Sequence, residues 1–105
     1  MPAILITTTT ATKEEAQRIA EALISGSLAA CVQISGPISS LYTWKGKREE
    51  SQEFRLSIKT KASLYPQVEA KIGELHSYEV PEIVACPIER GLKEYLQWIA
   101  EETLP

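Results

Sequence analysis

Branched and apolar residues are concentrated in several short stretches of the sequence, and this pattern is typical of β-strands. The stretches are residues 3–8, residues 28–34, residues 38–44, residues 53–59 and residues 82–88. The stretch 53–59 alternates cleanly, with Phe54, Leu56 and Ile58 on one face and polar residues on the other. A period of two predicts a strand that is buried on one side. Gly36 and Pro37 interrupt the stretch 28–44, which predicts one long strand with a bend or bulge.

Between these strands, apolar residues recur at three- and four-residue spacing, which predicts three helices. The first follows Thr12 and Glu15, whose spacing is that of a capping box, and it ends near Gly26. The second tolerates Pro66 because proline is acceptable in a first helical turn, and it ends near His76. The third is shorter and covers residues 92–99.

The order β-α-β-β-α-β-α predicts an α+β fold of the ferredoxin-like βαββαβ type. This is a two-layer sandwich, in which two helices cover one face of an antiparallel four-stranded sheet, with an extra C-terminal helix and a long hairpin between the second and third strands. The 105 residues, with a hydrophobic share of 44%, form one domain, 1–105.

Two features of this fold predict an oligomer. Residues 4–6 and 83–86 are apolar on both faces, although the two main helices cover only one. The hairpin strands are also longer than the usual ~5–6 residues, so their outer half extends past the domain's own core. A second copy of the chain is the simplest cover for both surfaces.

Composition and charge exclude several classes of partner. A net charge of -3 leaves no basic surface for nucleic acid. No apolar stretch approaches the ~20 residues of a membrane span, and no signal-peptide pattern is present, so we expect a cytoplasmic location and no membrane partner. Cys31 and Cys86 both lie in apolar stretches and are expected to be reduced core thiols.

Tyr42 and Trp44 stand two residues apart at the tip of the predicted hairpin. An isolated monomer would leave such a tryptophan exposed to solvent. Either a contact with a partner or ligand, or local packing, accounts for them.

His76 is the only histidine, which excludes a metal site built from two histidines of one chain. Its ring either places a cation at the negative end of the second helix or binds a ligand. With Cys31 or Cys86 it offers the soft ligands that suit copper, whereas buried cysteines also occur as inert core thiols. Glu53 and Lys59 share a face of their strand but are ~20 Å apart, so each needs another partner.

Known catalytic patterns are missing from the sequence. The threonines at residues 7–12 precede a helix, where anions can bind, but they include no arginine such as acylphosphatases of this topology use. We find no Ser/His/Asp set, no Cys/His set and no glycine-rich phosphate loop, so we expect no enzyme.

Six segments together resemble the CutA divalent-cation tolerance family, in the family's order. They are LAACVQI at 28–34, SLYTWKGK at 40–47, Glu53, IKT at 58–60, HSYEVPEI at 76–83 and YLQWI at 95–99. The resemblance implies a homotrimer that takes part in the response to metal ions, with tolerance of copper and other divalent cations. Because such trimers resemble PII signalling proteins, it also leaves open a PII-like adaptor that binds a small anion near Lys59 and a protein partner.

The resemblance also implies a cleft between subunits. Carried over to this sequence, its residues are Cys31, Tyr42, Trp44, Glu53, Lys59, His76, Tyr78 and Glu82. Of these, His76 and Cys31 are the expected ligands for Cu²⁺ or another divalent cation. The sequence departs from the family pattern in having Ser77 where a proline is usual. It also has threonines and Leu75 where some copper-associated members carry a cysteine and a second histidine.

Overall fold

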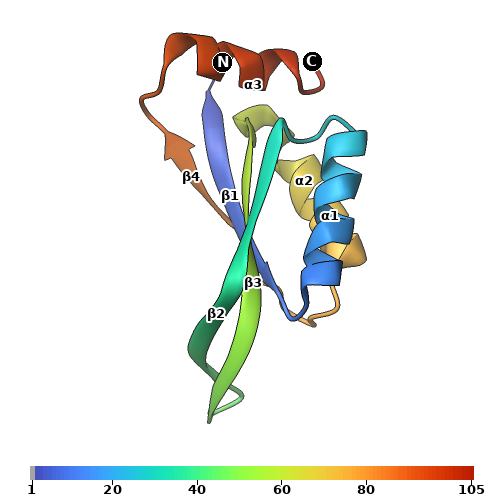
Figure 1. The fold of residues 1–105 in the computed structure, drawn as a ribbon, viewed down its shortest axis with the longest axis vertical. Coiled ribbons are helices and arrows are strands. Elements are labelled where there is room, and N and C mark those ends of the chain that lie inside the picture. Colours follow the sequence, from blue (N-terminus) through green and yellow to red (C-terminus); the bar gives the residue numbers. More distant parts are fainter. Residues whose placement is uncertain (1) are drawn as a thin grey trace.

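The computed structural model describes residues 2–105 and confirms the predicted order of elements (Figure 1). The elements are β1 (Ala3–Thr10), α1 (Lys13–Ser25), β2 (Cys31–Trp44), β3 (Lys47–Lys61), the 3₁₀ turn η1 (Ala62–Leu64), α2 (Tyr65–Leu75), β4 (Val84–Ile88) and α3 (Lys93–Glu101). The four strands form one antiparallel sheet in the order β2-β3-β1-β4. This is the ferredoxin-like α+β arrangement.

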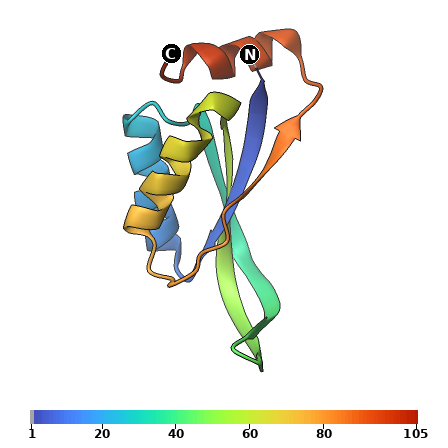
Figure 2. The ribbon, with the colours of Figure 1, turned by 180° about the vertical axis from the view of Figure 1, so that it is seen from behind.

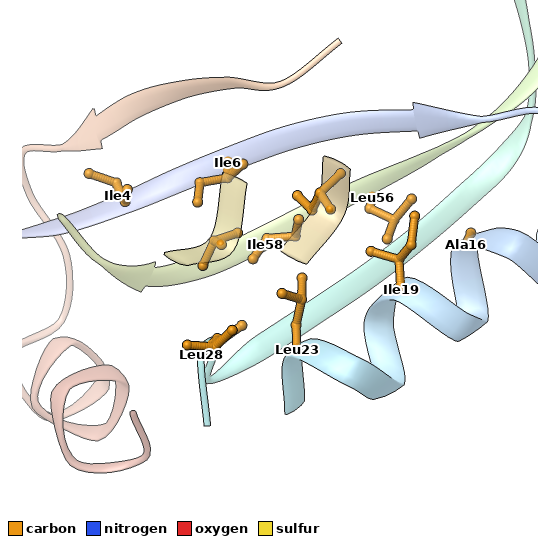
Figure 3. Close-up of a cluster of buried hydrophobic side chains, with 11 residues drawn as sticks. Ile4, Ile6, Ala16, Ile19, Leu23, Leu28, Leu56 and Ile58 are labelled. Atoms are coloured by element: carbon orange, nitrogen blue, oxygen red, sulfur yellow. The ribbon is translucent and has the colours of Figure 1, made fainter. Parts of the chain in front are cut away.

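Helices α1 and α2 lie together on one face of the sheet, as the two opposite views show (Figures 1 and 2). Helix α3 lies across the end of the sheet at which β1 begins. Alternate residues of β1 and β3, among them Ile6, Leu56 and Ile58, point toward the helices and are fully buried (Figure 3). Ile19 and Leu23 of α1 meet them, so the two periodicities of the sequence produce a single core.

The helix ends follow the predicted signals. The Thr12 hydroxyl accepts a hydrogen bond from the Glu15 amide at 3.1 Å, and Gly26 caps the other end of α1. Pro66 lies in the first turn of α2, and His76 is its C-cap residue. A proline there costs little because the first amides of a helix have no partner within the helix.

The β2–β3 hairpin extends well past the helices (Figure 1). Its strands pair from Trp44 opposite Lys47 back to Cys31 opposite Lys59, with the predicted bulge after Ser35. Lys45 and Gly46 both have positive φ angles, 52° and 78°, as a two-residue hairpin turn requires. Every residue from 41 to 50 is exposed in the single chain.

Several predicted strand boundaries were wrong. β1 continues to Thr10 because Thr7 to Thr10 pair with β3, so most of the threonines belong to a strand rather than to a loop that could hold an anion. β2 begins at Cys31 instead of residue 28, and β4 begins at Val84 instead of residue 82. β3 is longer than predicted, since its polar first half pairs with β2.

The face of the sheet opposite α1 and α2 carries apolar residues without cover from those helices. Leu5 is paired with Cys86 there, and Val84 is 50% exposed. The prediction that Cys86 is a core thiol is therefore wrong: it is exposed because β4 is an edge strand. Cys31 is half-buried, and neither cysteine forms a disulfide within residues 2–105. No helix in that part of the chain is long and apolar enough to cross a membrane.

Candidate functional site

A cleft of about 860 Å³ lies between the outer half of the hairpin and the loop that joins α2 to β4. We call it the acidic cleft. Its lining consists of Thr9, Ser39, Ser40, Leu41, Tyr42, Trp44, Glu49, Glu53, Ser77, Tyr78, Glu79, Val80 and Glu82. Ligand pockets for small molecules typically have volumes of ~300–1,000 Å³, so the acidic cleft has the size of a binding site.

The charged side chains of the acidic cleft are all negative. Four glutamates contribute to its lining, and no lysine, arginine or histidine among residues 2–105 does so. None of the four forms an ion pair with another described residue: within residues 2–105, Lys71 pairs with Glu74, and the carboxylate near His76 is that of Glu15. A concave surface whose charged side chains are all carboxylates attracts cations and repels anions.

Two aromatic side chains form the hairpin wall of the acidic cleft. Tyr42 and Trp44 alternate along β2 and therefore point to the same face of the hairpin. Tyr42 lies opposite Glu49 in the strand register and is hydrogen-bonded to Ser51, Oη to Oγ, at 3.3 Å. The Lys45 ammonium lies 5.8 Å from the centroid of the Trp44 ring, within the range of a cation–π contact.

A short hydrogen bond joins the hairpin to the opposite wall. The Tyr78 hydroxyl donates to Glu53 Oε2 at 2.7 Å, and Glu53 is only 7% exposed. Burial raises the pKa of Tyr78 well above its usual range, and the hydrogen bond to the Glu53 carboxylate and its negative charge raise that pKa further. Tyr78 therefore remains protonated, and a hydrogen-bond donor, above the pH of about 10 at which an ordinary tyrosine ionises.

His76 lies directly behind this wall with a fully buried side chain. Its Nε2 is 2.7 Å from the Thr9 carbonyl oxygen, which can only accept, so Nε2 carries a proton and donates. Its Nδ1 accepts from the Tyr78 amide at 3.1 Å. Both ring nitrogens are thus occupied by backbone partners, and neither has a free lone pair for a metal ion.

Glu15 fixes the same loop to the start of α1. Its carboxylate accepts from the Ser77 amide at 2.7 Å and from the Ser77 hydroxyl at 3.1 Å. Only the Thr12 half of the predicted capping box is formed, because the Glu15 carboxylate bonds to Ser77. The result is a rigid connection from α1 through His76 to Tyr78.

The eight predicted site residues fall into three groups, one of which is His76 alone, behind the wall of the acidic cleft. Tyr42, Trp44, Glu53, Tyr78 and Glu82 line the acidic cleft together. Cys31 and Lys59 do not line it. They lie opposite each other on β2 and β3, and Lys59 is four residues along β3 from Arg55, which pairs with the cleft residue Thr9. That separation corresponds to ~13 Å along the strand. The Lys59 ammonium instead contacts Gln33 Oε1 at 3.2 Å and the Tyr95 hydroxyl at 3.3 Å. As predicted, Glu53 and Lys59 find different partners.

The expected copper ligands do not fit one ion within one chain. His76 has no free nitrogen, and Cys31 lies toward the other end of the sheet. No three His, Cys, Asp or Glu side chains of residues 2–105 are grouped closely enough to hold a metal ion.

Sequence reasoning missed Glu49 and did not assign Glu79 to the site. The signal for Glu49 was the turn: a two-residue connection at Lys45 and Gly46 places residue 49 opposite Tyr42.

Comparison with known proteins agrees with this fold. The family model described as CutA1 divalent ion tolerance protein matches residues 4–102. The divalent-cation tolerance protein CutA of Archaeoglobus fulgidus is 49% identical over 88 residues, 84% of this chain and 85% of that protein. The protein of the same name from Thermus thermophilus is 44% identical over 95 residues, 90% of this chain and 92% of the relative.

Solved structures match over nearly the whole chain. The Thermus thermophilus divalent cation tolerance protein has a TM-score of 0.94 at 42% identity and covers 96% of this chain and 98% of its own. CutA1 from Oryza sativa has a TM-score of 0.96 at 39% identity, with coverage of 99% and 95%. A structure from Archaeoglobus fulgidus, at 45% identity and a TM-score of 0.92, covers 95% of this chain and 97% of its own and is described as periplasmic.

Proposed function

This chain belongs to the CutA1 divalent ion tolerance protein family, and we propose that it acts in divalent-cation tolerance as a homotrimer whose acidic cleft responds to cations. The observation that carries the proposal is the lining of the acidic cleft: four glutamates face one concavity without a basic residue among those described. Such a surface concentrates cations from solution.

A metal centre of His76 and Cys31 from the same chain does not fit this arrangement. If a metal ion is held at a fixed point, His76 must give up a backbone hydrogen bond or the donors must come from two subunits. Carboxylate oxygens of Glu49, Glu53, Glu79 and Glu82 are the available donors in the acidic cleft, and oxygen donors suit Mg²⁺, Ca²⁺ and Mn²⁺ better than copper.

Exposed apolar surface supports the oligomer. Leu41 on the hairpin and Val84 on the open sheet face are each at least half exposed in the single chain. Such surface is stabilised by contact with another subunit. Light scattering after size-exclusion chromatography tests this: the proposal expects three chain masses, and a monomer at micromolar concentration would contradict it.

Calorimetric titration of the trimer with Mn²⁺ and with Cu²⁺ tests the cation response. Glu53→Gln removes one buried charge with little change of shape, and Glu102→Gln, at the exposed end of α3, is the matched control. We expect Glu53→Gln to weaken binding about tenfold or more and the control to bind like the wild type. Equal affinities for all three proteins would exclude the acidic cleft as the cation site.

The PII-like alternative receives less support from this geometry. An anion in the acidic cleft would face four carboxylates, and the Lys59 ammonium that was expected to hold it is not part of the lining. That this chain binds a protein partner, and that it is located in the cytoplasm, both remain predictions. The family is named for tolerance rather than for a reaction, and we propose no catalytic activity.

A further inference from the structure

We infer that His76 is a pH-sensitive switch behind the wall of the acidic cleft. When its ring takes up a second proton, Nδ1 exchanges the Tyr78 amide for the Glu15 carboxylate, and the backbone of the loop is released at Tyr78. The inference goes beyond the proposed function and does not depend on it, because the exchange takes place behind the wall whether or not a cation binds in the cleft.

The neutral ring of His76 is held in one tautomer. Nε2 donates to the Thr9 carbonyl oxygen at 2.7 Å, so the nitrogen without a proton is Nδ1, which accepts from the Tyr78 amide at 3.1 Å. Histidine is the side chain that takes up a further proton between about pH 5 and 8, and in His76 that proton goes to Nδ1. An N–H at Nδ1 then faces the N–H of Tyr78. Because both groups are donors, this hydrogen bond breaks.

Glu15 lies where the protonated ring needs an acceptor. Its Oε2 is 3.7 Å from His76 Nδ1, and the two side chains are 5% and 0% exposed. A shift of about 1 Å brings this pair to the ~2.8 Å of a charge-assisted hydrogen bond. The carboxylate already accepts from the amide and the hydroxyl of Ser77, and each of its oxygens has a second lone pair, so it keeps Ser77. Only the Tyr78 amide loses its partner.

The other elements around His76 offer the charged ring no competing side chain. From β1 the ring contacts the backbone carbonyl of Thr9, which accepts in both protonation states. On α2, of which His76 is the C-cap residue, Lys71 and Glu74 pair with each other at 3.4 Å. The carbonyl end of that helix also favours a positive ring. Among residues 2–105, Glu15 is therefore the carboxylate that receives the protonated ring.

Release of the Tyr78 amide affects the bond that joins the loop to the hairpin. The same residue donates its hydroxyl to Glu53 Oε2 at 2.7 Å. Burial raises the pKa of Tyr78, so its phenol keeps its proton throughout the range in which histidine titrates. Acidification therefore frees the backbone of Tyr78 to move, and with it the phenol that holds Glu53.

Nuclear magnetic resonance of the full-length protein between pH ~8 and pH ~5 tests the exchange. The ring nitrogen shifts of His76 report its second proton, and hydrogen exchange reports the two neighbouring amides. After correction for the intrinsic pH dependence of exchange, we expect the protection of the Tyr78 amide to fall about tenfold as the ring is protonated. The Ser77 amide, which is bound to Glu15, should keep its protection.

Two variants separate the switch from a general effect of acid. The amide oxygen of His76→Asn can accept from Tyr78 but takes up no proton, so Tyr78 should keep its protection at both ends of the pH range. Glu15→Gln removes the charge that receives the ring and should move the loss of protection to lower pH. Glu102→Gln, at the exposed end of α3, should behave like the wild type.

Several results would overturn the inference. A ring that stays neutral down to pH ~5, or a Tyr78 amide that keeps its protection while the ring is protonated, would show that no switch operates. An equal loss of protection in His76→Asn would assign the effect to another group. An equal loss at Ser77 would mean that the whole loop opens and that Nδ1 does not exchange one partner for another. The first two results need only the wild type, so they hold even if a variant does not fold.

Discussion

Replacing His76 by alanine tests whether this histidine has a structural role or binds a metal ion. In the structure the ring is fully buried and connects two backbone groups, the Thr9 carbonyl at 2.7 Å and the Tyr78 amide at 3.1 Å. The variant His76→Ala leaves both backbone groups without these partners and opens a space behind the wall of the acidic cleft.

The magnitude follows from these contacts. Each buried backbone group that loses its partner costs about 1–3 kcal/mol, and the missing ring adds a cavity term. The two bonds belong to one network, so their costs do not simply add. We expect the free energy of unfolding to fall by about 2–5 kcal/mol.

Guanidinium denaturation at fixed protein concentration measures this change, since an oligomer's stability depends on concentration. His76→Gln and His76→Asn are the matched variants: a glutamine amide can donate to Thr9, and an asparagine oxygen can accept from Tyr78. Each should recover about 1 kcal/mol relative to alanine.

Cu²⁺ titration of the same proteins provides the contrasting result. A structural role predicts reduced stability in His76→Ala and partial rescue by the amides. An alanine variant that keeps its stability within about 0.5 kcal/mol but loses Cu²⁺ binding would refute this role and identify His76 as a ligand.

Three further predictions concern the hairpin, Tyr78 and the core. Gly36→Ala should lower the unfolding free energy by about 1–3 kcal/mol in denaturation, because the new Cβ would lie 2.6 Å from Phe54 Cδ2 at a φ of +154°. Gly73→Ala is the control in α2, where the new Cβ meets open space, and it should raise the unfolding free energy by about 0.5–1 kcal/mol. Equal changes of unfolding free energy in the two variants would contradict this prediction. The raised pKa of Tyr78 keeps its phenol protonated in the folded protein, whereas unfolded tyrosine ionises near pH ~10. The stability that this phenol contributes is therefore present below pH ~10 and is lost as pH rises toward the folded pKa, which ultraviolet titration measures. If the unfolding free energy of Tyr78→Phe changed with pH as steeply as that of the wild type, this prediction would be wrong. Ile19→Ala should cost about 2–5 kcal/mol in the same denaturation assay, whereas a cost below about 1 kcal/mol would place the residue outside the core.

The fold could be predicted because its signals are local. Alternation in β3 and the spacing around Ile19 in α1 are set by neighbours in the sequence, and both were read correctly. The ends of the strands could not be predicted from the sequence, because they depend on the pairing partner. Thr10, for example, belongs to β1 only because Phe54 lies opposite it. Cys86 was placed in the core for a similar reason, since an apolar stretch does not reveal that its strand lies at an edge.

The site could be predicted in part. Tyr42, Trp44 and Glu53 follow from the hairpin register and the family motifs, and they do line one cleft. The role of His76 could not be predicted, because its main partner is the backbone of Thr9, 67 positions earlier in the chain. The negative charge of the acidic cleft could not be predicted for the same reason, since its glutamates come from a strand and a distant loop.

A crystal structure of the trimer grown with Mn²⁺ tests the central claim most directly. We predict density for the cation at the carboxylates of the acidic cleft, with His76 still bonded to Thr9 and Tyr78. Density for a metal ion on His76, or a cleft filled by side chains of the neighbouring subunit with no room for a ligand, would contradict the claim.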